Sequence, residues 1–159
     1  MREKSNTCCF TGHRDISALS YQELADRTDP ILQMLINNGY KYFVCGGAIG
    51  FDTFAATYVC SLKKRGIDVK LVLMLPCRDQ TKNWGEYEKQ VYDYILSRAS
   101  SAEYITDSYT SWCMHERNRR LVNGSQICIA YMKESRGGTA FTFNYALQKG
   151  LEVINVAEE

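Results

Sequence analysis

Six short runs of apolar and β-branched residues, each separated from the next by a segment with helical spacing, limit the folds open to this sequence. The runs span residues 7–11, 41–45, 69–75, 102–106, 126–132 and 151–156. The third run, VKLVLML, is apolar almost throughout, which is typical of a strand that is covered on both faces. We therefore predict an α/β fold with a doubly wound, mainly parallel sheet of about six strands and helices on both faces.

The segments between these runs predict helices. In residues 20–38, Ser20 and Glu23 have the spacing of a capping box, whereas Pro30 predicts a kink or a division of the helix. We expect apolar stripes of the other helices to face the sheet. One such stripe contains Tyr87, Val91, Tyr94 and Ile95.

Size and charge restrict the classes of function. At 159 residues the chain is the size of one domain, and we expect residues 1–159 to share a single core. Its 19 basic and 18 acidic side chains give a formal net charge of +1. This balance disfavours nucleic acid and a membrane as partners, because both usually need a strongly basic face. The start, MREKSNTCCF, lacks the apolar length of a signal peptide or a spanning helix, so we expect a cytoplasmic protein.

The seven cysteines lie mostly inside apolar runs, and none forms a C-x-x-C motif or a Cys/His pair at zinc spacing. This pattern favours buried, reduced thiols over a metal site or redox chemistry. We expect no metal site and no required cofactor.

Four polar or glycine-rich stretches follow predicted strands or open the next predicted helix, so a parallel sheet would bring them to the same edge. The first is Thr11, Gly12, His13 and Arg14, where glycine lets a ligand approach the backbone and arginine can pair with phosphate. On its own, this stretch is equally compatible with a tight turn that exposes a histidine and an arginine.

The second stretch, CGGAIGFD, leads directly into a predicted helix. Gly46, Gly47 and Gly50, with Ala48 between them, allow a turn whose free N–H groups can accept phosphate without a lysine. Asp52 lies in the first helical turn, where it either contacts a ribose hydroxyl or complements the helix dipole. The spacing differs from that of G-x-G-x-x-G and Walker loops.

In the third stretch, Arg117 and Asn118 share the apolar stripe of a predicted helix, whereas Arg119 and Arg120 turn away from it. An inward guanidinium needs an anion, either a carboxylate of the protein or a phosphate of a ligand. The neighbouring loops favour the ligand. His115 and Glu116, on the same helix, are less constrained and can be solvent-exposed residues.

The fourth stretch is Arg136, Gly137, Gly138 and Thr139, with Thr139 as the predicted N-cap of the last helix. It offers a second set of backbone donors at the same edge. An ordinary loop and cap would explain it alone, but two such helix starts in one small domain favour phosphate or pyrophosphate binding.

Together, TGHR, GGAIGFD, residues 114–122 and GGT followed by Thr142 resemble the SLOG superfamily, in the expected order and over nearly the whole chain. This Rossmann-like group contains the LOG phosphoribohydrolases and the DNA-processing protein DprA, and the sequence is most similar to its bacterial YpsA-like branch. The resemblance implies binding of a nucleotide, with ADP-ribose or an NAD-related molecule as examples. Superfamily members often self-associate, so a homo-oligomer is an open alternative.

LOG enzymes cleave the N-glycosidic bond of nucleoside 5′-monophosphates, and Arg117 matches their catalytic arginine. Asn118 stands where they have a lysine, and Thr142 where they have a glutamate. A carboxylate stabilises the oxocarbenium-like state of such a reaction by its charge, which a hydroxyl cannot supply. The resemblance therefore argues against hydrolysis unless Glu116 or Asp52 provides the carboxylate.

We expect a sensing or regulatory module that binds a nucleotide or nucleotide-derived ligand, with LOG-like hydrolysis and DprA-like binding of single-stranded DNA as alternatives. The candidate catalytic residues are Arg117 and Glu116. The candidate ligand-binding residues are Thr11, Gly12, His13, Arg14, Gly46, Gly47, Ala48, Gly50, Asp52, Arg117, Asn118, Gly137, Gly138, Thr139 and Thr142.

Overall fold

The computed structural model describes residues 1–158 and contains one six-stranded sheet. Its strands are β1 (Thr7–Gly12), β2 (Tyr42–Cys45), β3 (Lys70–Cys77), β4 (Ser101–Thr106), β5 (Ile127–Tyr131) and β6 (Glu152–Asn155). They lie in the order β4-β3-β2-β1-β5-β6, and every neighbouring pair is parallel. The predicted doubly wound α/β fold is confirmed.

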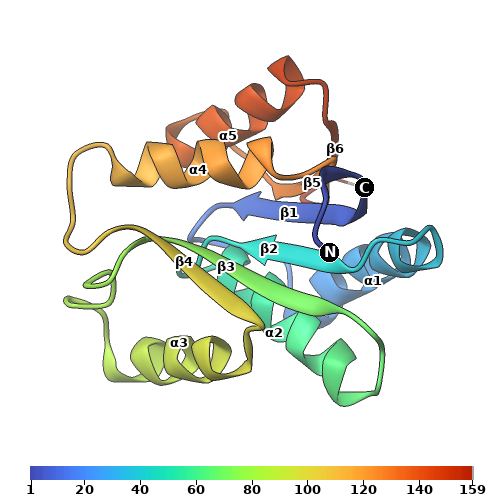
Figure 1. Ribbon diagram of the computed structural model, residues 1–159, viewed down its shortest axis with the longest axis horizontal. Coiled ribbons are helices and arrows are strands. Elements are labelled where there is room, and N and C mark those ends of the chain that lie inside the picture. The colour runs from blue at the N-terminus through green and yellow to red at the C-terminus, as the bar shows by residue number, and fades with distance from the viewer. Residues whose placement is uncertain (159) are drawn as a thin grey trace.

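Helices cover both faces of the sheet (Figure 1). They are α1 (Tyr21–Asn37), α2 (Phe51–Lys64), α3 (Glu86–Arg98), α4 (Cys113–Asn123) and α5 (Gly137–Gln148), preceded by a short 3-10 turn, η1 (Lys4–Asn6). Helices α4 and α5 lie on one side of the sheet, and α1, α2 and α3 lie on the other.

The core has two parts because successive strand side chains point to opposite faces. Phe10 and Phe43 pack with the helices α1, α2 and α3, whereas the adjacent Cys9 and Val44 pack with Leu121 of α4 and its neighbours. Both sets are almost fully buried. Strands covered on both faces explain why the runs in the sequence are apolar throughout.

Two helix predictions were wrong in part. Helix α1 continues through Pro30, which lies at an exposed position. The proline removes one backbone donor, but burial of Leu24, Leu32 and other side chains on the opposite face holds the helix together. In α3 only Ile95 of the predicted stripe is fully buried, because the helix sits at the margin of the sheet.

The side of the sheet on which successive strands are added changes between β1 and β5, although these two strands are parallel. Strands β1 to β4 are added on one side of this point, and β5 and β6 on the other. In such sheets the loops after the two central strands diverge to opposite faces, which leaves a crevice at their carboxyl ends. Gly12 and Tyr131 are the paired last residues of β1 and β5, so the crevice lies directly beyond them.

None of the helices within residues 1–158 combines the length and the apolar character that crossing a membrane requires.

Candidate functional site

A cleft of about 1650 Å³ lies beyond the carboxyl ends of β1 and β5. It is lined by all four polar or glycine-rich stretches that the sequence singled out. Eleven of the candidate ligand-binding residues contribute to its wall: Thr11, Gly12, His13, Arg14, Ala48, Asp52, Arg117, Asn118, Gly137, Gly138 and Thr139. The predicted convergence of these stretches at one edge of the sheet is therefore observed.

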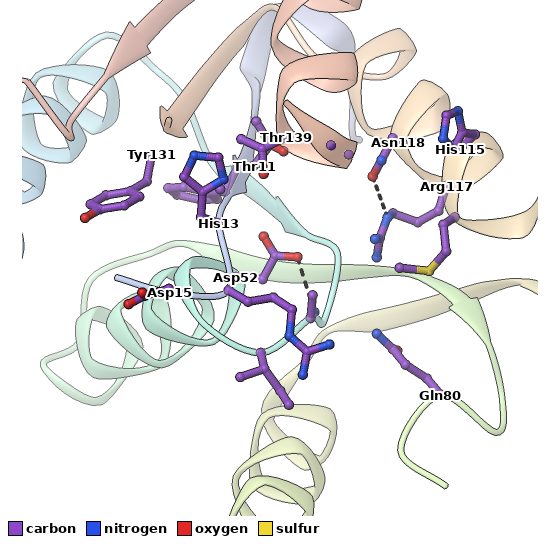
Figure 2. Close-up of a pocket in the computed structure, with 18 of the residues that line it drawn as sticks. Thr11, His13, Asp15, Asp52, Gln80, His115, Arg117, Asn118, Tyr131 and Thr139 are labelled. Atoms are coloured by element: carbon purple, nitrogen blue, oxygen red, sulfur yellow. Dashed lines mark hydrogen bonds between the residues drawn. The ribbon is translucent and has the colours of Figure 1, made fainter. Parts of the chain in front are cut away.

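Arg117 and Asn118 reach the cleft from α4 (Figure 2). Both are buried, at 4% and 7% exposure. Arg117 Nη1 donates to the carbonyl of Gly46, and its Nε donates to Asn118 Oδ1 at 2.7 Å. These bonds hold the guanidinium in one orientation. Within residues 1–158, no carboxylate oxygen lies within 4.0 Å of a guanidinium nitrogen of Arg117.

Asp52 is the carboxylate that most affects Arg117. It is 6% exposed, and its Oδ2 accepts a hydrogen bond from the Ala48 N–H at 3.2 Å. Burial raises its pKa to about 6, although the Arg117 charge and the Ala48 N–H act in the opposite direction. Burial likewise lowers the pKa of Arg117, against the effect of Asp52. The two residues thus form a loosely spaced pair of opposite charges.

Two glycines of the β2–α2 loop are required by close contacts. A Cβ on Gly46 would lie 2.6 Å from Arg117 Nη1 and 2.9 Å from Asp52 Oδ2, so a side chain there would separate the two charges. Gly50, the N-cap of α2, has φ 94° and ψ −124°, and a Cβ there would overlap the backbone of Arg14. Gly46, Gly47 and Gly50 shape the loop from behind and do not line the cleft.

His13 connects three loops at the floor of the cleft. Its carbonyl accepts from Phe51 N–H at the start of α2, and its N–H donates to the Tyr131 carbonyl at the end of β5. Its ring Nε2 accepts from the N–H groups of Lys133 and Glu134, at 3.1 and 3.2 Å. The histidine that the sequence placed beside the ligand is also a structural connector.

Helix α5 presents unpaired donors to the cleft. The N–H groups of Gly138 and Thr139 donate to no acceptor within residues 1–158. A Cβ on Gly138 would lie 3.7 Å from Asn118 Nδ2, which shows that this helix start faces the amide of α4. The predicted cap was wrong: Arg136 is the N-cap, without a side-chain bond, and Thr139 lies one turn in.

Two other candidate residues lie outside the cleft. Thr142 is fully buried, and its hydroxyl donates to the Gly138 carbonyl at 2.9 Å. Glu116 pairs with Arg119 and Arg120 on the surface of α4. The outward orientation predicted for these two arginines is confirmed. Glu116 pairs with them and therefore also points away from the cleft.

The cleft also has walls that the motifs did not indicate. Gln80 and Trp84 of the β3–α3 loop and Tyr109 of the β4–α4 loop line it, together with Lys82 and Lys133. They belong to no recognisable motif. Each follows the carboxyl end of a strand, and this position in the chain is the one sequence feature that could have indicated that they line the cleft.

The seven cysteines are free and buried, in agreement with the predicted buried thiols. Within residues 1–158, no group of three or more His, Cys, Asp or Glu side chains is arranged to hold a metal ion.

Comparisons with known sequences show what this chain is similar to. A sequence model described as the YspA SLOG family matches residues 9–154. The chain is 27% identical over 137 residues to the uncharacterized SPbeta prophage-derived protein YoqJ of Bacillus subtilis (strain 168), covering 78% of this chain and 80% of that protein. A UPF0398 protein of Lysinibacillus sphaericus (strain C3-41) is 26% identical over 113 residues, covering 69% and 63% of the two chains.

Solved structures share the fold. DNA processing protein A (DprA) from Streptococcus pneumoniae has a TM-score of 0.63 at 21% sequence identity, over 92% of this chain and 48% of that chain. DNA processing protein A from Helicobacter pylori, in a study of its single-stranded DNA binding mode, has a TM-score of 0.66 at 21% identity, over 94% and 65%. This chain thus spans about half to two thirds of the DprA chains.

Proposed function

Since the chain belongs to the YspA SLOG family, we propose that its cleft binds a nucleotide or nucleotide-derived ligand, such as ADP-ribose or an NAD-related molecule, and acts as a sensing or regulatory module. The observation that carries this proposal is that a buried guanidinium, Arg117, and the start of α5, with its unpaired N–H groups, line the same cleft. Together they offer positive charge and fixed donors to one anion.

Different residues of the cleft are suited to the phosphate groups and to the ribose of such a ligand. Arg117, the Asn118 amide and the N–H groups of Gly138 and Thr139 are suited to phosphate oxygens. Arg14, an exposed side chain that also lines the cleft, adds charge for a second phosphate. Asp52 is suited to a ribose hydroxyl, which can donate to the carboxylate oxygen that does not bind Ala48.

The first prediction compares two neighbouring arginines of α4. Arg117→Ala should weaken binding of ADP-ribose or AMP about tenfold to a hundredfold, because a charge-assisted hydrogen bond contributes roughly 1.5–3 kcal/mol. Arg119→Ala, the matched control, removes the same formal charge from a surface residue and should change the affinity less than twofold. Isothermal titration calorimetry measures both, with circular dichroism to verify folding.

Arg117 is buried, and its loss can destabilise the fold, so Asn118→Ala serves as a second variant. It removes the amide that faces Gly138 and should also weaken binding. Folded wild-type protein that binds no member of a panel of AMP, ADP, ADP-ribose, NAD and ribose 5-phosphate would contradict the proposal. So would equal losses in the two arginine variants.

A second candidate, single-stranded DNA binding, is favoured by the similarity to DprA over most of this chain. This similarity weakens the expectation from net charge that nucleic acid is a disfavoured partner. Arg14, Lys82 and Lys133 line the cleft without an ion pair among the described residues. An oligo(dT) titration at low and high salt tests this candidate, since phosphate contacts make binding fall steeply with salt.

Hydrolysis of the N-glycosidic bond is favoured by one observation alone. The threonine at the LOG glutamate position is buried and bonded, but Asp52 places a carboxylate beside Arg117 in the cleft. Incubation of AMP with concentrated protein, followed by chromatography for free adenine, distinguishes a hydrolase from a binding module. Loss of release in Asp52→Asn would assign the carboxylate.

A further inference from the structure

A second hollow, called here the α1–α3 groove, lies between the start of α1, one side of α2 and the start of α3. Its volume is about 750 Å³, within the range of about 300–1,000 Å³ that small-molecule pockets occupy. Leu24, Phe54 and Val91 form apolar parts of its wall. Tyr21 and Tyr87 also line it, at 61% and 75% exposure.

The groove adjoins the cleft. Arg14, Asp15, Ser17 and Ile49 line both hollows, and Gly50, the N-cap of α2, lines the groove. The exposed Arg14 side chain therefore stands between a cleft with several charged and polar residues and a largely apolar groove. One ligand can occupy both hollows if it has an anionic part and a flat apolar part.

The aromatic side chains of the groove indicate which kind of apolar ligand group fits it. Tyr21 stands edge-on to Phe54, with ring centroids 5.3 Å apart and the planes at 67°. Phe54 in turn stacks on Phe51, which extends the aromatic cluster under the groove. Rings of this kind favour stacked or edge-to-face partners. The hydroxyls of Thr53 and Thr57 add acceptors to the wall, so a heterocycle with a few polar edges fits better than an aliphatic chain.

From this arrangement, and on the basis of the proposed nucleotide binding, we propose that the α1–α3 groove receives the nucleobase of the ligand whose phosphate lies in the cleft. Arg14 lies at the junction, near the sugar and phosphate. Tyr21 and Tyr87 provide aromatic surface at the mouth of the groove, and Thr57 lies on its α2 wall.

The test compares AMP with ribose 5-phosphate, which has the same sugar and phosphate but no base. Wild-type protein should bind AMP about tenfold or more tightly than ribose 5-phosphate, since stacking of a base on an aromatic side chain contributes roughly 1–3 kcal/mol. Tyr21→Ala and Tyr87→Ala should remove most of this preference and leave the affinity for ribose 5-phosphate within twofold. Both side chains are exposed, so neither change threatens folding.

Two further variants sharpen the assignment. Thr57→Trp, which fills the groove from the α2 wall, should also abolish the preference for AMP. Leu147→Ala removes an exposed apolar side chain from α5 (53% exposed), away from both hollows, and should have no effect. Sedimentation of each variant, with and without ligand, reports whether a second copy of the chain covers the groove.

The outcomes separate this inference from the proposed function. Failure of both compounds to bind wild-type protein would sink the proposed function and this inference with it. Equal affinity for the two compounds, or a loss of preference in Tyr109→Ala and not in the groove variants, would overturn the nucleobase assignment alone. A change of oligomeric state in Tyr21→Ala with unchanged AMP affinity would also overturn it, in favour of self-association.

Discussion

At the scale of single residues, the cleft contains a charged pair that the protein holds apart. Gly46 lies between Arg117 and Asp52, and Arg117 donates to the Gly46 carbonyl in place of a carboxylate. Burial of both charges costs free energy that their weak mutual attraction does not fully offset. Stability therefore does not explain the pair, whereas the proposed ligand, bound beside the two groups, would give both of them a partner.

The raised pKa of Asp52 has a consequence for stability. Between its ordinary pKa of 3.8 and its folded pKa of about 6, the folded carboxyl binds a proton more tightly than the unfolded one. The free energy of unfolding that Asp52 contributes therefore falls as pH rises through this window, by about 3 kcal/mol in total. Asp52→Asn removes this contribution, so the variant should gain about that amount relative to wild type between pH 4 and pH 7.

Urea unfolding followed by tryptophan fluorescence at pH 4, 5, 6 and 7 measures the difference. Asp68→Asn, a change at an exposed carboxylate, serves as the control and should track wild type. Parallel stability curves for wild type and Asp52→Asn would show that Asp52 titrates alike in the folded and unfolded chains.

The predictions for single residues were correct where they rested on the helical spacing of apolar residues. Helical spacing placed Arg117 and Asn118 on the buried side of α4 and Arg119 outside, as observed. The charge relation between Asp52 and Arg117 was not predicted, because the two residues are distant in the sequence and meet only through the β2–α2 loop. Sequence reasoning alone left open whether Asp52 binds ribose or complements the helix dipole.

At the scale of elements, the loops after β1 and β2 are fitted to each other. The φ of Gly50 is one that side chains rarely adopt, and a Cβ there would meet the Arg14 backbone, which cannot move aside cheaply. This contact fixes the start of α2 against the loop that carries His13 and Arg14. The shape of the cleft thus depends on a glycine that does not line it.

Gly50→Ala should therefore cost about 3 kcal/mol or more in unfolding free energy, since strain at positive φ adds to a backbone overlap. Gly66→Ala is the matched control: Gly66 also has positive φ, at 83°, but a Cβ there would meet nothing within 4 Å. It should cost only about 1 kcal/mol. Chemical denaturation compares the two, and equal losses would mean that the contact with Arg14 relaxes.

The start of a helix was predictable where neighbouring residues, such as a capping box, determine it. The capping box of Ser20 and Glu23 begins α1 as expected, with Glu23 N–H donating to Ser20 Oγ at 3.1 Å. The kink or division predicted at Pro30 was wrong because burial of the opposite face of α1 outweighs the loss of one backbone N–H donor. The cap predicted at Thr139 was wrong because a glycine with positive φ, Gly137, begins the turn earlier than the capping residue.

At the scale of the whole molecule, two layers of helices enclose the sheet and leave no thiol at the surface. All seven cysteines are buried. Burial raises the pKa of Cys8 and Cys45, and a hydrogen bond with Cys9, together with burial, raises the pKa of Cys128. A thiol reacts as the thiolate, so access is unfavourable for all seven cysteines, and ionisation is unfavourable for those whose pKa is raised.

The native protein should therefore react very slowly with Ellman's reagent at pH 8, whereas all seven thiols should react in guanidinium chloride. The ratio of the two rates reports how rarely the core opens. Prompt reaction of one or more thiols in the native state would identify a local opening, and addition of AMP should suppress it if that opening lies beside the cleft.

The parallel direction of the strands was predictable because apolar runs that alternate with helices permit few topologies, whereas the strand order within the sheet was not predicted. The α1–α3 groove was not predictable, since Tyr87 and Tyr94 fit the helical stripe that predicted burial. Only the position of α3 at the margin of the sheet leaves Tyr87 and Tyr94 exposed, and no local pattern encodes that position.

The hydrogen bonds of His13 determine its tautomer. Because Nε2 accepts from two backbone N–H groups, the neutral ring must carry its proton on Nδ1. Nδ1 has no acceptor within residues 1–158 and belongs to a residue of the cleft wall. A ligand oxygen that reaches this imidazole therefore meets a proton donor, and it does so without disturbing the three loops that the same residue joins.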